Sequence, residues 1–202
     1  MAEVPVPAGV RDAVLRELYR QVASLDWDEV PSRNKTTYYT QWVEDPAIGG
    51  ELADYYTAEG MRVWLKDGPL KEYVRALEDI GSYARYTTKR LSPASEFVCD
   101  VLGKTWTIVP GSIREKPMHC TVTDGEHDRY VCWGKPNTFR DLLWAAVNKA
   151  PGAPTRPLIV VYTLKGADVG LRARAQYQRI TTHCSLDLAF VYRRLEERPP
   201  AP

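Results

Sequence analysis

Signals for membrane insertion and export are absent from this chain of 202 residues. No apolar run approaches the ~18 residues that a membrane-spanning helix needs. The first twelve residues have neither the basic segment nor the apolar core of a secretory signal. The four cysteines are far apart, without the short C-x₂₋₄-C spacing typical of zinc sites. We therefore expect a soluble, cytoplasmic protein that has reduced thiols, no zinc and no membrane partner.

Net charge is also nearly absent, at +1, but the charges are unevenly distributed. Residues 1–100 carry 12 Lys and Arg against 17 Asp and Glu, whereas residues 101–202 carry 15 against 9. The basic second half is compatible with an anionic partner, although two complementary faces of one core would give the same pattern. The chain also lacks repeats and long linkers. The sequence therefore predicts one domain over 1–202.

Residues 7–91 are expected to be rich in helix. Apolar residues recur every four positions from Val10 to Val22, which predicts a helix over 10–23. A second helix is predicted from Pro69 to Ile80, with Gly81 at its C-terminal cap. Residues 61–66 and 82–88 are predicted to be strands, and periodicity does not decide between helix and strand for 36–46.

Residues 92–195 are expected to form a sheet core in the order helix, three strands, helix, strand. The fold class predicted from this order is α+β, with a mixed, mostly antiparallel sheet. A hairpin formed by 96–101 and 105–109 is the competing interpretation of the first helix. The core is followed by a basic helix over 171–180, an alternating strand over 186–195 and a disordered tail over 196–202. The two core helices are expected over 92–103 and 137–150, and the four core strands over 105–109, 117–123, 129–134 and 157–164.

This αβββαβ order resembles the core of the PD-(D/E)XK nuclease-like superfamily, over about a third of the chain. In that family, strand-borne acids hold a divalent metal, a lysine two residues after the second acid assists the attacking water, and a helix glutamate often joins them. The resemblance implies Glu96 and Asp124 as ligands of Mg²⁺ and Lys135 as the residue that orients water. Trp133 stands where the second acid is expected, which leaves cleavage undecided. Ordinary cap, turn and surface roles are the alternative for Glu96, Asp124 and Lys135.

A basic cluster suggests where a nucleic acid would bind. Arg172, Arg174 and Arg179 lie on the predicted helix 171–180, with Gln176, Tyr177 and Gln178 between them. Arginine pairs with phosphates, and amides and rings contact bases or sugars. The alternative is a solvated helix without a partner. The leading hypothesis is therefore a DNA- or RNA-binding protein with a nuclease-like core.

Two other functions remain open. The chain is compatible with a non-enzymatic protein-interaction or sensor module, or a homo-oligomer, that makes contact through exposed aromatics between Tyr38 and Trp42. An enzyme acting on a small molecule would need a pocket that gathers His119 or His183 with an acid. A five-residue turn between the strands 117–123 and 129–134 would place Cys120 opposite Cys132, as two small core residues.

Overall fold

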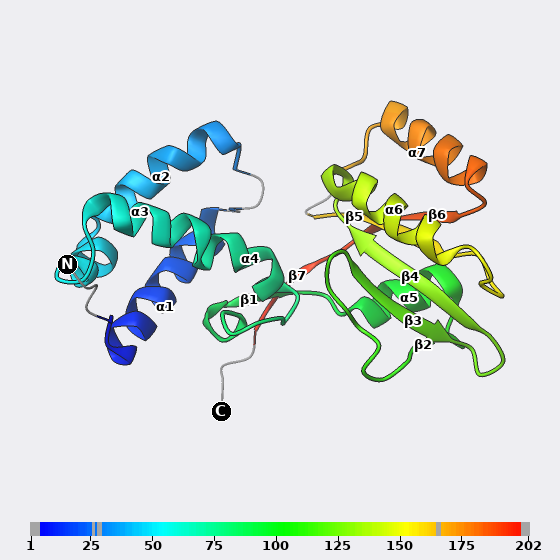
Figure 1. The fold of residues 1–202 in the computed structure, drawn as a ribbon, viewed down its shortest axis with the longest axis horizontal. Helices are drawn as coiled ribbons and strands as arrows, with labels where there is room; N and C mark the ends of the chain where they lie inside the picture. The colour runs from blue at the N-terminus through cyan, green and yellow to red at the C-terminus, as the bar shows by residue number, and fades with distance from the viewer. Residues whose placement is uncertain (1–4, 26, 28–29, 165–166, 199–202) are drawn as a thin grey trace. The chain divides into compact units, whose positions relative to one another are not determined.

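The structure is a computed structural model that describes residues 5–25, 27, 30–164 and 167–198. The chain divides into two compact units, one of residues 1–91 with 196–202 and the other of residues 92–195 (Figure 1). The first unit is built mainly from helices, and the second is built around a mixed five-stranded sheet. The α+β fold class is therefore confirmed, whereas the single domain stays a prediction. Among the described residues, no helix combines the length and apolarity that crossing a membrane requires.

Four α-helices form most of the first unit. Their bounds are α1 Ala8–Leu25, α2 Ser32–Glu44, α3 Ala58–Asp67 and α4 Pro69–Leu77, and a π-helical turn spans Pro46–Gly50. The helices predicted over 10–23 and 69–80 are confirmed, although the second ends three residues earlier. The undecided segment 36–46 is helical as far as Glu44. Two short strands, β1 Lys89–Leu91 and β7 Leu195–Glu197, pair with each other.

Two predicted strands of this unit are wrong. Residues 61–66 are short and rich in apolar side chains, but they belong to α3. Met61 and Leu65, four positions apart, are buried, whereas Val63 is 49% exposed. This is the period of a helix and not of a strand. In 82–88, a short 3-10 helix over Ala84–Tyr86 replaces the strand. Its tyrosine packs against the buried ring of Tyr19, at 6.3 Å between ring centroids.

The tail predicted to be disordered also needs a correction. Glu196 and Glu197 belong to β7. The guanidinium of Arg198 pairs with the carboxylate of Asp79, and the Arg198 amide donates to the carbonyl of Thr88 at 2.7 Å. These contacts hold the end of the described chain to the first unit. Residues 199–202 lie outside the described residues.

The second unit contains the predicted element order. Helix α5 covers Ala94–Leu102 and excludes the competing hairpin. The strands follow as β2 Thr107–Ile108, β3 Met118–Thr123 and β4 Asp128–Gly134. A 3-10 turn over Pro136–Thr138 leads into α6 Phe139–Lys149, and then come β5 Leu158–Thr163, α7 Leu171–His183 and β6 Asp187–Tyr192.

The sheet is mixed, with spatial order β2-β3-β4-β5-β6. The pairs β2–β3 and β3–β4 are antiparallel, whereas β4–β5 and β5–β6 are parallel. Antiparallel pairing is therefore not in the majority. The parallel half follows from the two helical crossovers, because α6 and α7 each return the chain to the end of the sheet where the preceding strand began.

Helices cover both faces of this sheet. On one face, Cys132, Ile159 and Val161 pack with the apolar sides of α6 and α7. Neighbouring strand residues point to the opposite face. There Trp133 contacts Phe97 of α5, with ring centroids 5.5 Å apart. This three-layer arrangement explains why β5 is buried on both sides, as its unbroken apolar sequence predicts.

The register of β3 against β4 corrects one further prediction. Thr123 is paired with Asp128, so the connecting loop has four residues and not five. Cys120 therefore lies opposite Val131, and His119 lies opposite Cys132. A shift of one residue turns a side chain to the other face, so Cys120 and Cys132 are buried on different faces. Burial raises the pKa of both thiols to about 12.

Candidate nucleic-acid interface

Asp124 stabilises the β3–β4 turn. Its Oδ1 accepts hydrogen bonds from the backbone amides of His127 at 2.8 Å and Glu126 at 3.0 Å. These bonds to the charged form lower the pKa of the Asp124 carboxyl below its usual value. Gly125 adopts a φ of 97° in the same turn, which favours glycine. The carboxylate thus has a complete structural role as a turn former.

The structure does not bring Asp124 and Lys135 together. Asp124 precedes Asp128 at one end of β4, and Lys135 follows Gly134 at the other end. The six residue steps between these strand ends span about 20 Å, at ~3.4 Å per residue. A metal ion held by Asp124 would therefore be far outside the reach of a water molecule that is oriented by Lys135.

Glu96 lies in the first turn of α5 and has a cationic partner. Its Oε2 is 2.9 Å from the guanidinium of Arg194. The next residue, Phe97, packs on Trp133. Glu96 is thus placed near the end of β4 that Lys135 follows, and not near Asp124. Among the described residues, no three His, Cys, Asp or Glu side chains gather in a group that would hold a metal.

A buried arginine occupies the α5 face of the sheet at this same end. Arg193 is 1% exposed, and its guanidinium lies 5.0 Å from the ring centroid of Tyr162 and 5.5 Å from that of Phe97. Its Nε donates to the carbonyl of Ser92 at 3.2 Å. Trp133, 1% exposed, stands nearby in the position expected for an acid. A guanidinium and an indole at this place offer no oxygen ligand to Mg²⁺.

The three predicted phosphate-binding arginines have different environments. Arg174 is engaged within the protein, because its Nε donates to the carbonyl of Val169 at 3.0 Å and its Nη2 pairs with Asp168. Its guanidinium also lies 4.7 Å from the ring centroid of Phe190. Arg172 and Arg179 are exposed. The structure therefore divides the basic cluster into one structural arginine and two surface arginines.

The exposed side of α7 forms a straight basic stripe. It consists of Arg172, Gln176, Arg179 and His183, and we call it the α7 stripe. These positions follow the i, i+4, i+7, i+11 pattern of a single helix face. Helix α7 contains no acidic residue. The opposite side of the helix packs on the sheet, and there Tyr177 stacks on Phe139 at 3.8 Å between ring centroids.

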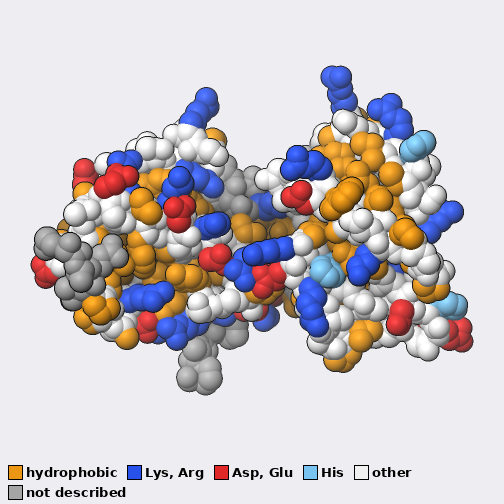
Figure 2. All heavy atoms as spheres, viewed as in Figure 1, with side chains coloured by type: hydrophobic (Ala, Val, Ile, Leu, Met, Phe, Trp, Pro, Cys, Tyr) orange, Lys and Arg blue, Asp and Glu red, His pale blue; other side chains and the backbone are white. Residues whose placement is uncertain are grey.

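An exposed aromatic residue lies on the neighbouring helix. Trp144 of α6 is 70% exposed, although α6 and α7 share one apolar core beneath them. Figure 2 shows Lys, Arg and His side chains around hydrophobic ones over these two helices. The sequence reasoning missed Trp144. It lies off the apolar face that Phe139, Leu142 and Ala146 define, and this position was the available signal.

One hollow gathers His119 with an acid, as the hypothesis of an enzyme acting on a small molecule requires. His119 lines a hollow of about 370 Å³, together with Asp128, Tyr130 and Lys149. Its Nδ1 lies 2.8 Å from the carbonyl oxygen of Pro117, so this nitrogen carries the proton when the ring is neutral. No hydrogen bond or ion pair between His119 and an acid is found among the described residues. His183 lies at the exposed end of α7.

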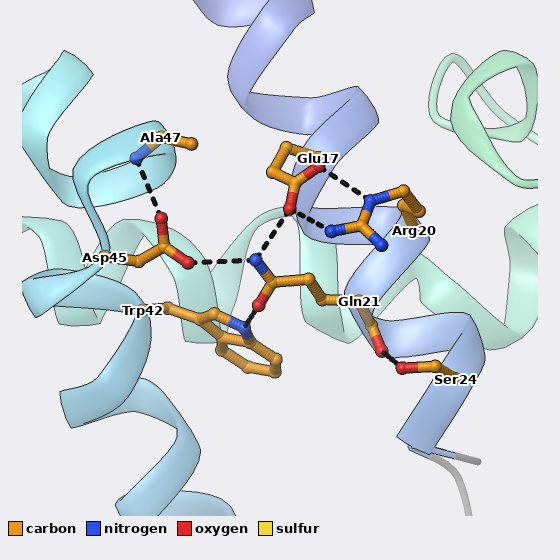
Figure 3. Close-up of polar contacts among 7 residues, drawn as sticks. All are labelled: Glu17, Arg20, Gln21, Ser24, Trp42, Asp45 and Ala47. Carbon is orange, nitrogen blue, oxygen red and sulfur yellow. Dashed lines mark hydrogen bonds and ion pairs between the residues drawn. The ribbon is translucent and has the colours of Figure 1, made fainter.

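Of the aromatics proposed as a contact for a protein partner, Trp42 has a structural role, whereas Tyr38 and Tyr39 are half-buried. Trp42 is 2% exposed, and its ring centroid lies 5.1 Å from that of Trp27. Its Nε1 donates to Oε1 of Gln21 at 2.9 Å, and the amide nitrogen of Gln21 donates to Glu17 and Asp45 (Figure 3). The network joins α1 and α2 to the start of the π-helical turn. Trp42 is therefore not available for a partner.

Comparisons with known proteins add no family to this description. No family model matches the chain, and no curated protein or solved structure matches it significantly.

Proposed function

We propose that this protein binds nucleic acid through the α7 stripe. The observation that supports the proposal best is the exposure of Arg172 and Arg179 on one face of a helix that contains no acid. The two arginines are separated by seven residues, or about 10.5 Å along the helix axis. Each can form a bidentate pair with a different phosphate of one strand. The stripe lies in the more basic half of the chain.

Trp144 suggests the form of nucleic acid that suits this surface. An exposed indole on α6, the helix that shares an apolar core with α7, provides a platform on which an unpaired base stacks, at roughly 1–3 kcal/mol per base. Paired bases within a duplex do not offer their faces to a side chain. We therefore expect single-stranded DNA or RNA to bind more tightly than a duplex of the same length.

The proposal concerns binding and leaves cleavage undecided. A cleaving version would use Mg²⁺ as its cofactor, and Glu96, Asp124 and Lys135 would have to act together. The distance of about 20 Å along β4 between the last two disfavours this version. The cytoplasmic setting also belongs to the proposal, and it is supported by the four free thiols.

The test is a titration of labelled single-stranded 20-mers, followed by fluorescence anisotropy between 50 and 300 mM NaCl. The double variant Arg172→Ala/Arg179→Ala is expected to bind at least tenfold more weakly than the wild type. Its plot of log K against log salt concentration should be less steep by roughly 1.4, since each lost phosphate contact on a single strand removes about 0.7. The control is Lys66→Ala/Lys71→Ala, which removes two exposed positive charges from the first unit.

Two results would contradict the proposal. One is binding that does not change with salt, and the other is equal affinity of the two double variants. Trp144→Ala should weaken single-strand binding by about 5- to 150-fold, the equivalent of roughly 1–3 kcal/mol, and duplex binding much less. Incubating a labelled strand with Mg²⁺ or Mn²⁺ tests the cleaving version. If the wild type cleaves the strand and both Asp124→Asn and Lys135→Ala abolish this cleavage, the cleaving version is supported.

A protein partner is the second candidate, and a groove in the first unit supports it. The groove between α2 and α3 has a volume of about 570 Å³ and is lined by Tyr39 and Val63 among charged residues. The side chain of Val63 is 49% exposed. A partner in this groove would be lost with Val63→Asp and retained in the α7 double variant. This pattern would separate the two candidates.

A further inference from the structure

The hollow of about 370 Å³ that His119 lines lies on the face of the sheet that carries α6 and α7, and we call it the β3–β4 hollow. His119 lies opposite Cys132 in the pairing of β3 with β4, and opposite residues of a ladder share one face. Tyr130, two residues before Cys132, points to the same side. Cys132 packs with α6 and α7, and Lys149, the last residue of α6, lines the hollow. The hollow is thus beside the C-terminal end of α6.

Two opposite charges line the hollow without pairing. Asp128 provides a carboxylate at the start of β4, and Lys149 provides an ammonium group. Neither side chain forms an ion pair or a hydrogen bond within the described part of the chain. Arg129 also lines the hollow, but its Nε donates to the carbonyl of Arg156 at 2.8 Å and its Nη2 pairs with Asp187. A ligand that balances the two free charges must itself carry one negative and one positive group.

The walls of the hollow are held by hydrogen bonds within the protein. Thr155 Oγ1 donates to the carbonyl of Asp128 at 2.7 Å, which fastens the loop after α6 to the start of β4. On the other side, Ser112 Oγ donates to the carbonyl of Thr121 at 3.1 Å and accepts from its amide at 3.2 Å. The hollow therefore does not need a ligand to form. Its volume is at the lower end of the ~300–1,000 Å³ of ligand pockets, which suits a small molecule.

An aromatic surface adjoins the two charges. Tyr130 follows Asp128 by two residues, so the two side chains share one face and start about 7 Å apart along β4. The ring of His119 lies beside that of Tyr130, with 5.2 Å between ring centroids and 37° between planes. Burial raises the pKa of the Tyr130 phenol, so this group stays uncharged at neutral pH. The two rings offer a surface on which an aromatic group of a ligand packs.

We infer that the β3–β4 hollow binds a free α-amino acid with an aromatic side chain. The carboxylate of the ligand pairs with Lys149, its ammonium group pairs with Asp128, and its ring packs on Tyr130. An α-amino acid carries both charges on one carbon and its ring one carbon further, which matches the order of charges and rings along β4. A phosphate group fits less well, because its negative charges would meet the carboxylate of Asp128.

This site is separate from the α7 stripe. The residues of the stripe, which are Arg172, Gln176, Arg179 and His183, do not line the hollow. Binding of an amino acid can therefore be tested without nucleic acid, and the failure of one proposal leaves the other unaffected.

The test is an NMR titration of the whole ¹⁵N-labelled chain with L-phenylalanine up to 20 mM. The amide signals of Tyr130 and Thr155 are expected to shift and to saturate. Two analogues each lack one charge: 3-phenylpropanoate lacks the ammonium group, and 2-phenylethylamine lacks the carboxylate. Each should bind about three- to fivefold more weakly, as expected for the loss of one partly exposed ion pair. L-alanine, which keeps both charges but lacks the ring, should also bind more weakly.

Two substitutions assign each charge of the ligand to its partner. Lys149→Gln should weaken the binding of L-phenylalanine and 3-phenylpropanoate by about three- to fivefold and leave 2-phenylethylamine unchanged. Asp128→Asn should weaken L-phenylalanine and 2-phenylethylamine and leave 3-phenylpropanoate unchanged. Both side chains are exposed, so the variants are expected to fold, and the NMR spectra show whether they do. The matched control is Asp141→Asn, which changes an exposed acid of α6 outside the hollow and should alter none of these affinities.

Several results would overturn the inference. One is a spectrum that does not change at 20 mM L-phenylalanine, and another is a set of shifts centred outside the hollow. Equal affinity for L-phenylalanine and its two single-charge analogues would also contradict it, as would binding that neither Lys149→Gln nor Asp128→Asn weakens.

Discussion

Protonation of Glu17 provides a direct test of the polar network in the first unit. The Glu17 carboxylate accepts from Nε of Arg20 at 2.8 Å and from the amide nitrogen of Gln21 at 2.8 Å (Figure 3). These hydrogen bonds, with that from Arg20 the strongest, lower the pKa of Glu17 from 4.5 to about 2. The folded state thus favours the charged carboxylate. Glu17→Gln removes this charge and keeps the shape of the side chain.

The size of the effect follows from the shift. A change in pKa from 4.5 to about 2 corresponds to at most ~3.4 kcal/mol at 1.36 kcal/mol per unit. The side chain of Arg20 is 65% exposed, so solvent and salt screen its part of the interaction. We therefore expect Glu17→Gln to lower the free energy of unfolding by about 1–2 kcal/mol at pH 7.

The pH dependence has a definite sign. Because the folded state has the lower pKa, the contribution of Glu17 is complete above the unfolded value of about 4.5 and is lost as the pH falls toward 2. Urea unfolding at pH 7, 5, 4 and 3, followed by far-ultraviolet circular dichroism, measures the difference between wild type and variant. The difference should be constant at pH 7 and 5 and shrink at pH 4 and 3.

The control is Glu51→Gln, which changes an exposed glutamate of the same unit. This variant should differ from the wild type by less than about 0.5 kcal/mol at every pH. A Glu17→Gln difference that stays the same from pH 7 to pH 3 would refute the reasoning, because the stabilisation would then not depend on the charge of Glu17.

Two further predictions concern the backbone of the first unit. A Cβ added at Gly49 would lie 1.9 Å from the carbonyl oxygen of Val43, so Gly49→Ala should lower the free energy of unfolding by about 3 kcal/mol or more. Gly50→Ala should not, because the nearest contact of its Cβ would be 3.8 Å away. Equal urea midpoints for the two variants would contradict this prediction. Thr57 Oγ1 caps α3 by accepting a hydrogen bond from the amide of Gly60 at 3.1 Å. Thr57→Ala should therefore lower the free energy of unfolding by about 1 kcal/mol in the same assay, and Thr57→Ser by much less. An unchanged urea midpoint for Thr57→Ala would show that this cap does not stabilise the helix.

Much of the fold was predictable from local patterns. The helix α5, the strands β3 to β5 and the helix α6 were all expected from caps, turns and periodicity, and the structure confirms them. The strand predicted over 61–66 was wrong because six residues are too few to separate the two periods, and only burial shows that Met61 and Leu65 form the inner face. The register of β3 against β4 was missed by one residue, since it depends on the length of the turn.

The candidate site was less predictable. The spacing of seven residues places Arg172 and Arg179 on one face of a helix, but only the structure shows that this face is exposed. The contacts of Arg174 with Asp168 and Phe190 could not be predicted from the sequence. They depend on how the residues before α7 and the strand β6 fold against this helix. Trp144 could have been identified by its position outside the apolar face of its helix.

The sequence by itself determined the order of helices and strands, because hydrophobic periodicity, caps and turn residues act over a few neighbouring positions. It also determined that Trp133, and not an acid, follows Cys132 in the third strand of the core. Only the tertiary structure decided which residues meet. It separated Asp124 from Lys135 along β4, buried Arg193 against Phe97 and gathered Asp128 and Lys149 around one hollow. These outcomes depend on register and layering, which arise from contacts between residues that are distant in the chain.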